Sequence, residues 1–315
     1  MVQAGTNSIS VSQAEQDLRA ELARSDLALG SIAPVLRHLL TNADHSLFSD
    51  EVVARVRGML GDLARQLLAV EAEEAGEEDP LAIAQHGAHR LVSGLAVDAP
   101  LLGHVHALAI EWQLTETLQA RDAIDASLSP LLQTQIASRD PGAAEVAMAT
   151  LAAQVRFMQQ ARRMELPLGE LSAELFHAAL EVLRTHSDRP DAAVRTVARL
   201  REEYDEGHSR LALISRLITG LGATAMAALE IERAGVALFL SALALASGQE
   251  RDLVVLSTSS DQLARLSVAL QAAGVKGEQA AAQMALLQPE ATLPDHFDAM
   301  TSNEAAAILA SIGGA

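Results

Sequence analysis

Cysteine is absent from this chain, and lysine occurs only once, at Lys276. Without a thiol the protein cannot form a disulfide, use a cysteine nucleophile or hold an iron–sulfur cluster through cysteine. A Walker-type phosphate loop needs the sequence glycine–lysine–serine or threonine, whereas the single lysine stands in Gly274-Val-Lys-Gly277. Schiff-base chemistry also requires a lysine, usually one that burial has made less basic. The glycine-flanked Lys276 is a poor candidate for that role.

Aromatic residues make up only 2% of the sequence, although strands favour aromatic and β-branched side chains. Alanine and leucine, which are strong helix formers, are abundant instead. With 50% hydrophobic and 20% charged residues over 315 positions, the chain can bury a sizeable core. These features predict an all-α fold, either a helical array or two packed helical bundles, of about twelve helices.

The chain is acidic, with a formal net charge of −18 and a pI near 4.9. Nucleic acids and anionic lipid surfaces attract lysine and arginine, so neither is expected as a partner. Two apolar stretches, 211–229 and 234–246, are interpreted as buried helices. The first contains Arg216 and several glycines, and the second is shorter than the roughly 20 residues that a membrane span needs. With no apolar stretch after Met1, we expect a cytoplasmic protein without a membrane span.

The clearest helix is predicted from Ser49 to about Val70. Its apolar residues recur at three- and four-residue steps and share one stripe: Val52, Val56, Met59, Leu60, Leu63, Leu67 and Val70. Ser49 is expected to cap the helix. Four polar residues lie off the stripe and are expected to face away from the core: Arg55, Arg57, Asp62 and Gln66. The acidic run 71–79 is interpreted as a solvated loop, and Asp79-Pro80 as the start of the next helix.

Further helices follow along the chain, separated by short breaks rich in glycine, proline and aspartate. They are expected at about 80–95, 100–119, 121–136, 143–163, 170–186, 191–206, 208–219, 223–247, 259–273, 276–287 and 302–312. The segment Leu253–Leu256 is interpreted as helix or loop, because a single strand would have no partner. The break at Ser187–Pro190 suggests an N-terminal helical region, 1–186, and a C-terminal helical region, 187–315, unless the chain forms one continuous domain.

Several short motifs between residues 140 and 290 are similar to those of a known group of proteins. They are Ala147-Met148, Leu151-Ala-Ala-Gln154, Arg156-Phe157 and Arg162-Arg-Met-Glu-Leu-Pro-Leu168. This segment resembles uncharacterised alphaproteobacterial helical proteins that are HEAT-like. The resemblance implies a helical-repeat tendency for residues 140–290 and assigns no catalytic residue.

Histidines form the only cluster in the sequence worth testing as a site. His86 and His89 stand three residues apart on the expected helix 80–95, about 60° apart around its axis. His86 lies nearly opposite the apolar stripe of that helix, so both histidines could point outward together. His104 and His106 are about 200° apart on the next helix and cannot share a metal there. If the two helices pack antiparallel, His106 could join His86 and His89 in a three-histidine zinc site. We favour solvent-facing histidines on a helical hairpin and expect no bound metal.

Other motifs are weaker. Gly220-Leu-Gly-Ala-Thr-Ala225 has the form of a dinucleotide-binding loop, but it follows a predicted helix instead of a strand and lacks the later acidic residue. It is interpreted as a turn between helices. Gly207-His-Ser-Arg-Leu211 lacks the closing glycine of a nucleophile elbow. The acidic residues around Tyr204 are interpreted as a solvated helix end.

No catalytic residue and no cofactor-binding residue is therefore predicted. The favoured function is a non-enzymatic helical scaffold or regulatory adaptor that binds another protein in a groove between helices. One alternative is an enzyme or phosphotransfer protein that uses histidine or carboxylate chemistry. Another is a bundle that binds an apolar ligand between its helices. The sequence does not indicate the partner or the oligomeric state.

Overall fold

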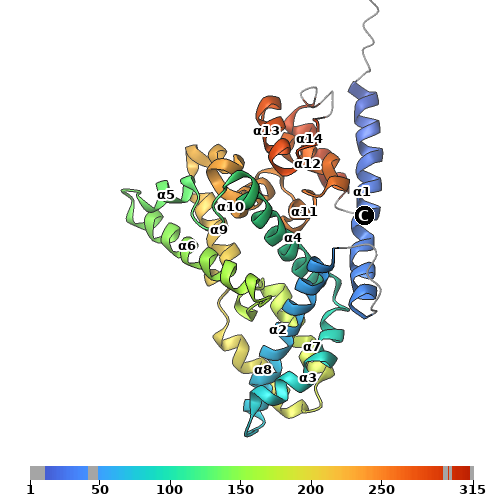
Figure 1. The fold of residues 1–315 in the computed structure, drawn as a ribbon, viewed down its shortest axis with the longest axis vertical. Helices are drawn as coiled ribbons and strands as arrows, with labels where there is room; N and C mark the ends of the chain where they lie inside the picture. The colour runs from blue at the N-terminus through green and yellow to red at the C-terminus, as the bar shows by residue number, and fades with distance from the viewer. Residues whose placement is uncertain (1–10, 42–48, 294–296, 298–299, 313–315) are drawn as a thin grey trace, which may run out of the picture.

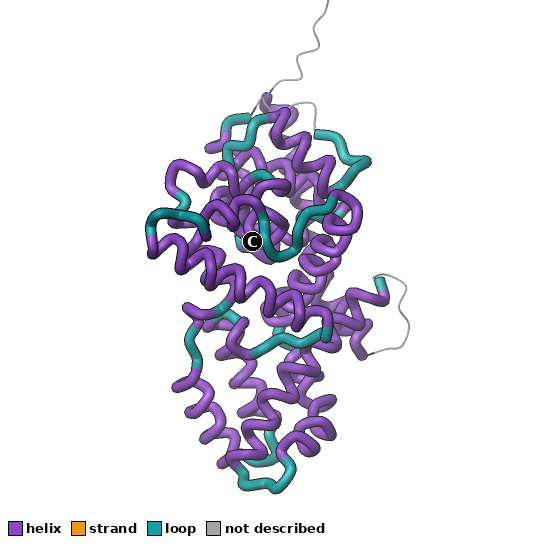
Figure 2. Tube along the Cα trace, turned by 60° about the vertical axis from the view of Figure 1, so that its left-hand side comes forward, coloured by secondary structure: helices purple, strands orange, loops and turns teal. Residues whose placement is uncertain are grey.

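A computed structural model describes residues 11–41, 49–293, 297 and 300–312. Over these residues the chain is all-α, without a strand, which confirms the predicted fold class (Figure 2). The first seven helices are α1 (Val11–Thr41), α2 (Asp50–Glu74), α3 (Pro80–Leu95), α4 (Ala99–Asp122), α5 (Pro130–Ile136), α6 (Pro141–Arg162) and α7 (Ala173–His186). They are followed by α8 (Pro190–Glu203), α9 (Arg210–Gly220), α10 (Ile231–Ser247), α11 (Arg251–Leu256), α12 (Leu263–Ala272), α13 (Gly277–Leu287) and α14 (Ser302–Ile312). Four short 3-10 helices connect them: η1 (Leu168–Glu170), η2 (Glu206–His208), η3 (Gly222–Leu229) and η4 (Ser260–Gln262).

The helix starts follow the local chemistry that the sequence indicates. The Ser49 hydroxyl accepts a hydrogen bond from the Val52 amide, and the Asp79 carboxylate accepts one from Ala82 with Pro80 in the first helical turn. Both caps satisfy amides that have no partner within the helix. The predicted cap and the Asp79-Pro80 start are thus confirmed.

Three segments differ from the expected helix pattern. The helix α1 was not expected, and the expected helix 121–136 is reduced to α5, since Ala123 adopts a left-handed conformation that ends α4. The expected helix 223–247 is divided into η3 and α10, and α10 is itself kinked at Gly235. Gly235 has a φ of +72°, and a Cβ there would lie 3.3 Å from the Ser129 Cβ, so this position requires glycine. The segment Leu253–Leu256 belongs to α11.

Two groups of buried apolar side chains form the interior. The first, here called the α2 core, draws most of its residues from α2, α3, α4, α7 and α8. The second, the α10 core, is built around α10 and α12 with residues from α4, α5, α9, α11, α13 and α14. Figure 1 shows α2, α3, α7 and α8 at one end of the molecule and α10 to α14 at the other, with α1 along one side.

Two long helices connect these cores. Helix α4 contributes Leu101 and Trp112 to the α2 core and Leu118 to the α10 core. Helix α6 contributes Ala147 to the α10 core and Phe157 to the α2 core. The middle of each helix therefore lies where the two cores meet.

The predicted division at Ser187–Pro190 stays a prediction. Helix α8 follows this break, yet its residues Val197 and Leu200 belong to the α2 core, together with residues from α2 and α7. The α2 core therefore contains residues from both sides of the predicted boundary between 1–186 and 187–315.

The two apolar stretches noted in the sequence form helices. The stretch 234–246 lies in α10, most of which is buried, whereas 211–229 is divided between α9 and η3, and residues 222–226 are exposed. Among the described residues, no single helix has both the length and the hydropathy of a membrane span. Helices α3 and α4 meet those criteria only when taken together, across a bend of 108°.

Polar residues of α2 hold the end of α6. The predicted apolar stripe of α2 is buried from Val52 to Leu67, but Arg55 is buried as well, and Asp62 and Gln66 are partly buried. The Asp62 carboxylate accepts a hydrogen bond from the Leu166 amide at 3.0 Å. The Gln66 amide donates to the Leu166 carbonyl and accepts from the Leu168 amide. Arg57 is exposed, as expected. For Arg55, Asp62 and Gln66 the expectation that they face away from the core was wrong, because the end of α6 and the turn after it pack over them.

The acidic run after α2 also differs from the expected solvated loop. Helix α2 continues to Glu74, and Glu71 is only 2% exposed. Its carboxylate accepts a hydrogen bond from the Ser187 hydroxyl and lies 3.8 Å from the guanidinium of Arg189. The segment between α7 and α8 thus provides the polar partners that burial of Glu71 requires.

We expect Leu63→Ala to lower the free energy of unfolding by about 2–5 kcal/mol, because it removes a fully buried side chain and leaves a cavity. Asp62→Ala should lower it by about 1–3 kcal/mol, since the partly buried Leu166 amide loses its acceptor. Asp62→Asn retains an acceptor oxygen and is the matched control. Urea unfolding measures all three variants, and an Asp62→Ala variant as stable as the native protein would contradict the contact between α2 and the turn.

Candidate functional site

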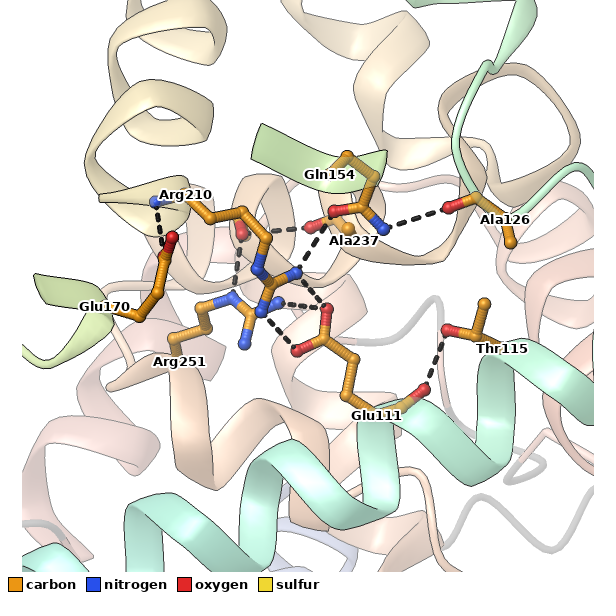
Figure 3. Close-up of polar contacts among 9 residues, drawn as sticks. Glu111, Thr115, Ala126, Gln154, Glu170, Arg210, Ala237 and Arg251 are labelled. Atoms are coloured by element: carbon orange, nitrogen blue, oxygen red, sulfur yellow. Dashed lines mark hydrogen bonds and ion pairs between the residues drawn. The ribbon is translucent and has the colours of Figure 1, made fainter. Parts of the chain in front are cut away.

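A buried ion cluster lies where the two cores meet (Figure 3). The Glu111 carboxylate, from the middle of α4, accepts two hydrogen bonds from the Arg210 guanidinium at the start of α9, at 2.8 and 3.0 Å. Arg251, at the start of α11, donates to the same carboxylate at 2.8 Å. Glu111 and Arg210 are each 1% exposed. The cluster therefore joins three helices through charges that are shielded from water.

Neighbouring groups complete the cluster. Gln154 of α6 accepts a hydrogen bond from Arg210 and donates one to the Ala126 carbonyl, and the Arg210 guanidinium lies 3.7 Å from the centre of the Phe157 ring. Burial alone would raise the pKa of Glu111, but the charges and hydrogen bonds of Arg210 and Arg251 lower it well below its ordinary value of 4.5. Glu111 is thus ionised at neutral pH.

A histidine–aspartate pair stands beside this cluster. The His104 Nδ1 on α4 lies 2.9 Å from an Asp252 carboxylate oxygen on α11. Burial would raise the pKa of Asp252, but His104 and Arg251 lower it below its ordinary value. Because a carboxylate only accepts hydrogen bonds, the His104 Nδ1 carries the proton. Its Nε2 is covered by protein and has no hydrogen-bond partner among the described residues.

Arg251 of the cluster and the His104–Asp252 pair line one wall of a groove along α9. The groove has a volume of about 770 Å³, and an adjoining cavity of about 310 Å³ shares Leu211, Ser215 and Arg251 with it. Leu211, Ser215 and Thr219 follow one another at intervals of four residues along α9 and form its long side. We call the two cavities together the α9 groove. Leu175 of α7 and Leu245 of α10 add apolar surface to it.

The rim of the α9 groove carries an excess of carboxylates. Glu206 and Glu250 are exposed, and neither forms an ion pair with a described residue. Arg251 is paired with Glu111, whereas Arg216 donates a hydrogen bond to the neutral Gly207 carbonyl and keeps its positive charge. The lining still contains more carboxylates than basic groups, because Glu170, Glu206 and Glu250 stand against Arg216. The groove can therefore accept positive charge at its rim and apolar groups along α9.

The structure does not bring together the three histidines that the sequence suggested as candidate metal ligands. His86 and His89 are exposed on α3, as expected, and line a cavity of about 510 Å³ that also contains His186. His106 is 3% exposed and lines a different cavity, below α1. The expectation that His106 lies on the polar side of its helix was wrong. Over the residues that the structure describes, no three histidine or carboxylate side chains are placed to hold a metal ion.

The residues of the ion cluster were not found by reasoning from the sequence. Glu111 and Arg210 are 99 residues apart and Glu111 and Arg251 are 140 apart, so no local spacing connects them. The available signal was a charged residue within an apolar helical pattern, as at Glu111 in Ala109-Ile-Glu-Trp112. Such a residue needs a buried partner, but the sequence does not identify which one.

The chain was compared with protein-family models, with curated proteins and with solved structures, and none of them matches it. The resemblance of residues 140–290 to HEAT-like helical proteins therefore stays a prediction.

We expect Glu111→Gln to lower the free energy of unfolding by about 3–5 kcal/mol, because it leaves two buried guanidinium groups without their counter-charge. The depressed pKa of Glu111 also stabilises the fold above pH 4.5, and this contribution is lost as the pH falls below that value. The variant should therefore lose less stability than the native protein between pH 5 and 3. Urea unfolding at several pH values measures both effects, with Glu116→Gln, exposed on the same helix, as the control.

A second pH effect is expected from His106, whose pKa burial lowers to about 4. Between pH 6.5 and 4 the unfolded chain binds the proton at this residue more readily than the folded protein does, so stability falls as the pH falls. The maximum slope is about 1.4 kcal/mol per pH unit. His106→Asn should reduce the fall in stability over this range, and equal slopes for the two proteins would contradict the assignment.

Proposed function

We propose that this protein is a non-enzymatic helical adaptor that binds a basic, partly apolar segment of a partner protein in the α9 groove. The proposal rests on the composition of the α9 groove. Apolar side chains line the groove along α9, and carboxylates without an ion-pair partner stand on its rim. The sequence predicted an adaptor without a defined binding surface. The proposal adds the α9 groove as that surface and a basic, partly apolar segment as its ligand.

The dimensions of the groove support a peptide segment as the ligand. Leu211 and Thr219 are eight residues apart, so their Cα atoms are separated by about 12 Å along α9. About two turns of a partner helix span that distance. Leu211 and Leu245 offer apolar contact along it, and Leu245 is 52% exposed. An amphipathic helix that inserts its apolar face into a groove is a common mode of peptide recognition.

The charge distribution supports a basic segment. Glu206 and Glu250 stand on the rim, and the whole chain has a net charge of −18. Complementary charge accelerates association and selects among partners. A lysine or arginine on the polar face of the bound segment would meet these carboxylates, whereas an acidic segment would be repelled.

The environment of the titratable groups supports binding over catalysis. Glu111 is fully engaged by two arginines, and the His104 Nε2, the atom that would act as a base or accept a phosphoryl group, is covered by protein. A general base must reach the proton that it removes. The perturbed pKa values of Glu111 and Asp252 are explained by ion pairs that hold the helices together.

Site-specific photocrosslinking tests the proposal. A benzophenone amino acid placed at the exposed Thr219 should crosslink to a partner in extract from the native cells, while the same group at Val194, exposed on α8, should not. Mass spectrometry should place the crosslink within a segment rich in lysine or arginine. A crosslinked segment that is acidic or uncharged would contradict the proposal.

The synthetic form of that segment should then bind the protein directly. We expect Glu206→Lys combined with Glu250→Lys to weaken binding at least tenfold, about 1.4 kcal/mol, and more strongly at low salt than at high salt. The matched control is Glu145→Lys combined with Glu278→Lys, which makes the same charge change at exposed positions on α6 and α13. Equal weakening by the two double variants would show that only net charge matters and would reject the groove as the site.

A further inference from the structure

Helix α6 buries only one of its sides, which faces the two cores. On the opposite side Met148 is 61% exposed and Val155 is 37% exposed, and Ala152 between them is exposed as well. These three residues follow one another at steps of four and three, so they share one apolar stripe. Figure 1 shows α6 at the edge of the molecule opposite α1. Such a stripe is buried when a second helix packs against it.

Four charged residues flank this stripe and are exposed: Asp140 and Glu145 near the start of α6, and Arg156 and Arg162 near its end. With about 100° per residue, Glu145 and Arg156 lie about 20° apart around the helix axis on one flank of the stripe. Asp140 and Arg162 lie about 40° apart on the other flank. None of the four forms an ion pair with a described residue, whereas most other arginines of the described chain do. We call the stripe and these four residues the α6 face.

The charges of the α6 face are arranged about one midpoint. Glu145 and Arg156 are centred between positions 150 and 151, and Asp140 and Arg162 are centred at position 151. When two copies of α6 pack antiparallel across a two-fold axis at this midpoint, each flank of one helix lies beside the same flank of the other. Glu145 then meets Arg156 of the second copy and Asp140 meets Arg162, and the symmetry repeats each contact. Both pairs of opposite charge therefore specify the same alignment of the two helices.

Charge also favours a second copy of this chain over an unrelated partner. The whole chain has a net charge of −18, so two copies repel each other over most of their surface. The α6 face, by contrast, carries two carboxylates and two guanidinium groups and is neutral. Its two halves have opposite charge, so the face is complementary to itself in the antiparallel orientation. A parallel pair would place Glu145 beside Glu145 and Arg156 beside Arg156, which is unfavourable.

We propose that the α6 face is the contact between two copies of this chain in a symmetric, antiparallel dimer. Ion pairs on both flanks enclose the apolar stripe, and Met148 lies beside Ala152 of the second copy, whose small side chain permits close approach. A contact made by one helix is at the small end of known interfaces, so the dimer dissociates on dilution. The α6 face shares no residue with the α9 groove. The variant that combines Glu145→Lys with Glu278→Lys should therefore be monomeric and still bind the basic segment, which keeps the two proposals separate.

Analytical ultracentrifugation at low salt tests the dimer. The average mass should rise with concentration from 33.2 kDa towards twice that value. Met148→Asp places a charge in the stripe and should keep the protein monomeric. Val194→Asp makes the matched change at a position on α8 that is 59% exposed, and it should leave the dimer unchanged. A constant mass of 33.2 kDa up to roughly millimolar concentration, or equal loss of the dimer in both variants, would overturn the proposal.

Exchange of charges determines the orientation of the two helices. Glu145→Arg and Arg156→Glu should each weaken the dimer at least about tenfold, because like charges then face each other twice across the axis. Both variants should keep the circular dichroism spectrum of the native protein, since both positions are exposed. An equimolar mixture of the two single variants should form a heterodimer, and the double variant should dimerise again, because each restores opposite charges at the contact. Failure of either rescue would reject the antiparallel contact at the α6 face.

Discussion

The structure depends on a single buried carboxylate, that of Glu111, which pairs with two arginines at the junction of the two cores. Each ion in such a cluster costs several kcal/mol to remove from water, and only close, well-directed pairing offsets that cost. The pairing is possible only when α4, α9 and α11 keep their relative positions. One negative and two positive groups leave an excess of positive charge, and the ionised Asp252 nearby compensates for it. The ion cluster therefore fixes the junction between the α2 core and the α10 core.

This constraint extends to the α9 groove. Arg251 belongs to the ion cluster and also lines the α9 groove, so the wall of the groove is held by the same contacts that join the cores. His106 and Ile110, which precede Glu111 in the same helix, line a different cavity together with residues of α1. One helix thus provides residues to the ion cluster and to two separate surfaces, one rimmed by carboxylates and one mostly apolar.

Much of the fold could be predicted from local sequence, because caps and apolar stripes depend on residues within a few turns. Ser49, Asp79-Pro80 and the stripe of α2 are examples. The errors concern residues whose environment is set by distant segments: Asp62 was expected in solvent but holds the turn after α6, and His106 was expected on a polar face but is covered by α1. For the same reason, the sequence predicted a groove between helices but not its position along α9.

The long separation between the members of the ion cluster bears on how the protein folds during synthesis. Glu111 leaves the ribosome 140 residues before Arg251, a delay of roughly 7 to 28 s at the usual rates of 5–20 residues per second. Until Arg210 has been made, 99 residues after Glu111, the middle of α4 cannot be buried without leaving the carboxylate unpaired. The nascent chain can form isolated helices and part of the α2 core, but the junction must wait for the last quarter of the polypeptide. A ribosome-bound chain that ends before Arg210 thus presents the apolar faces of α4 to chaperones.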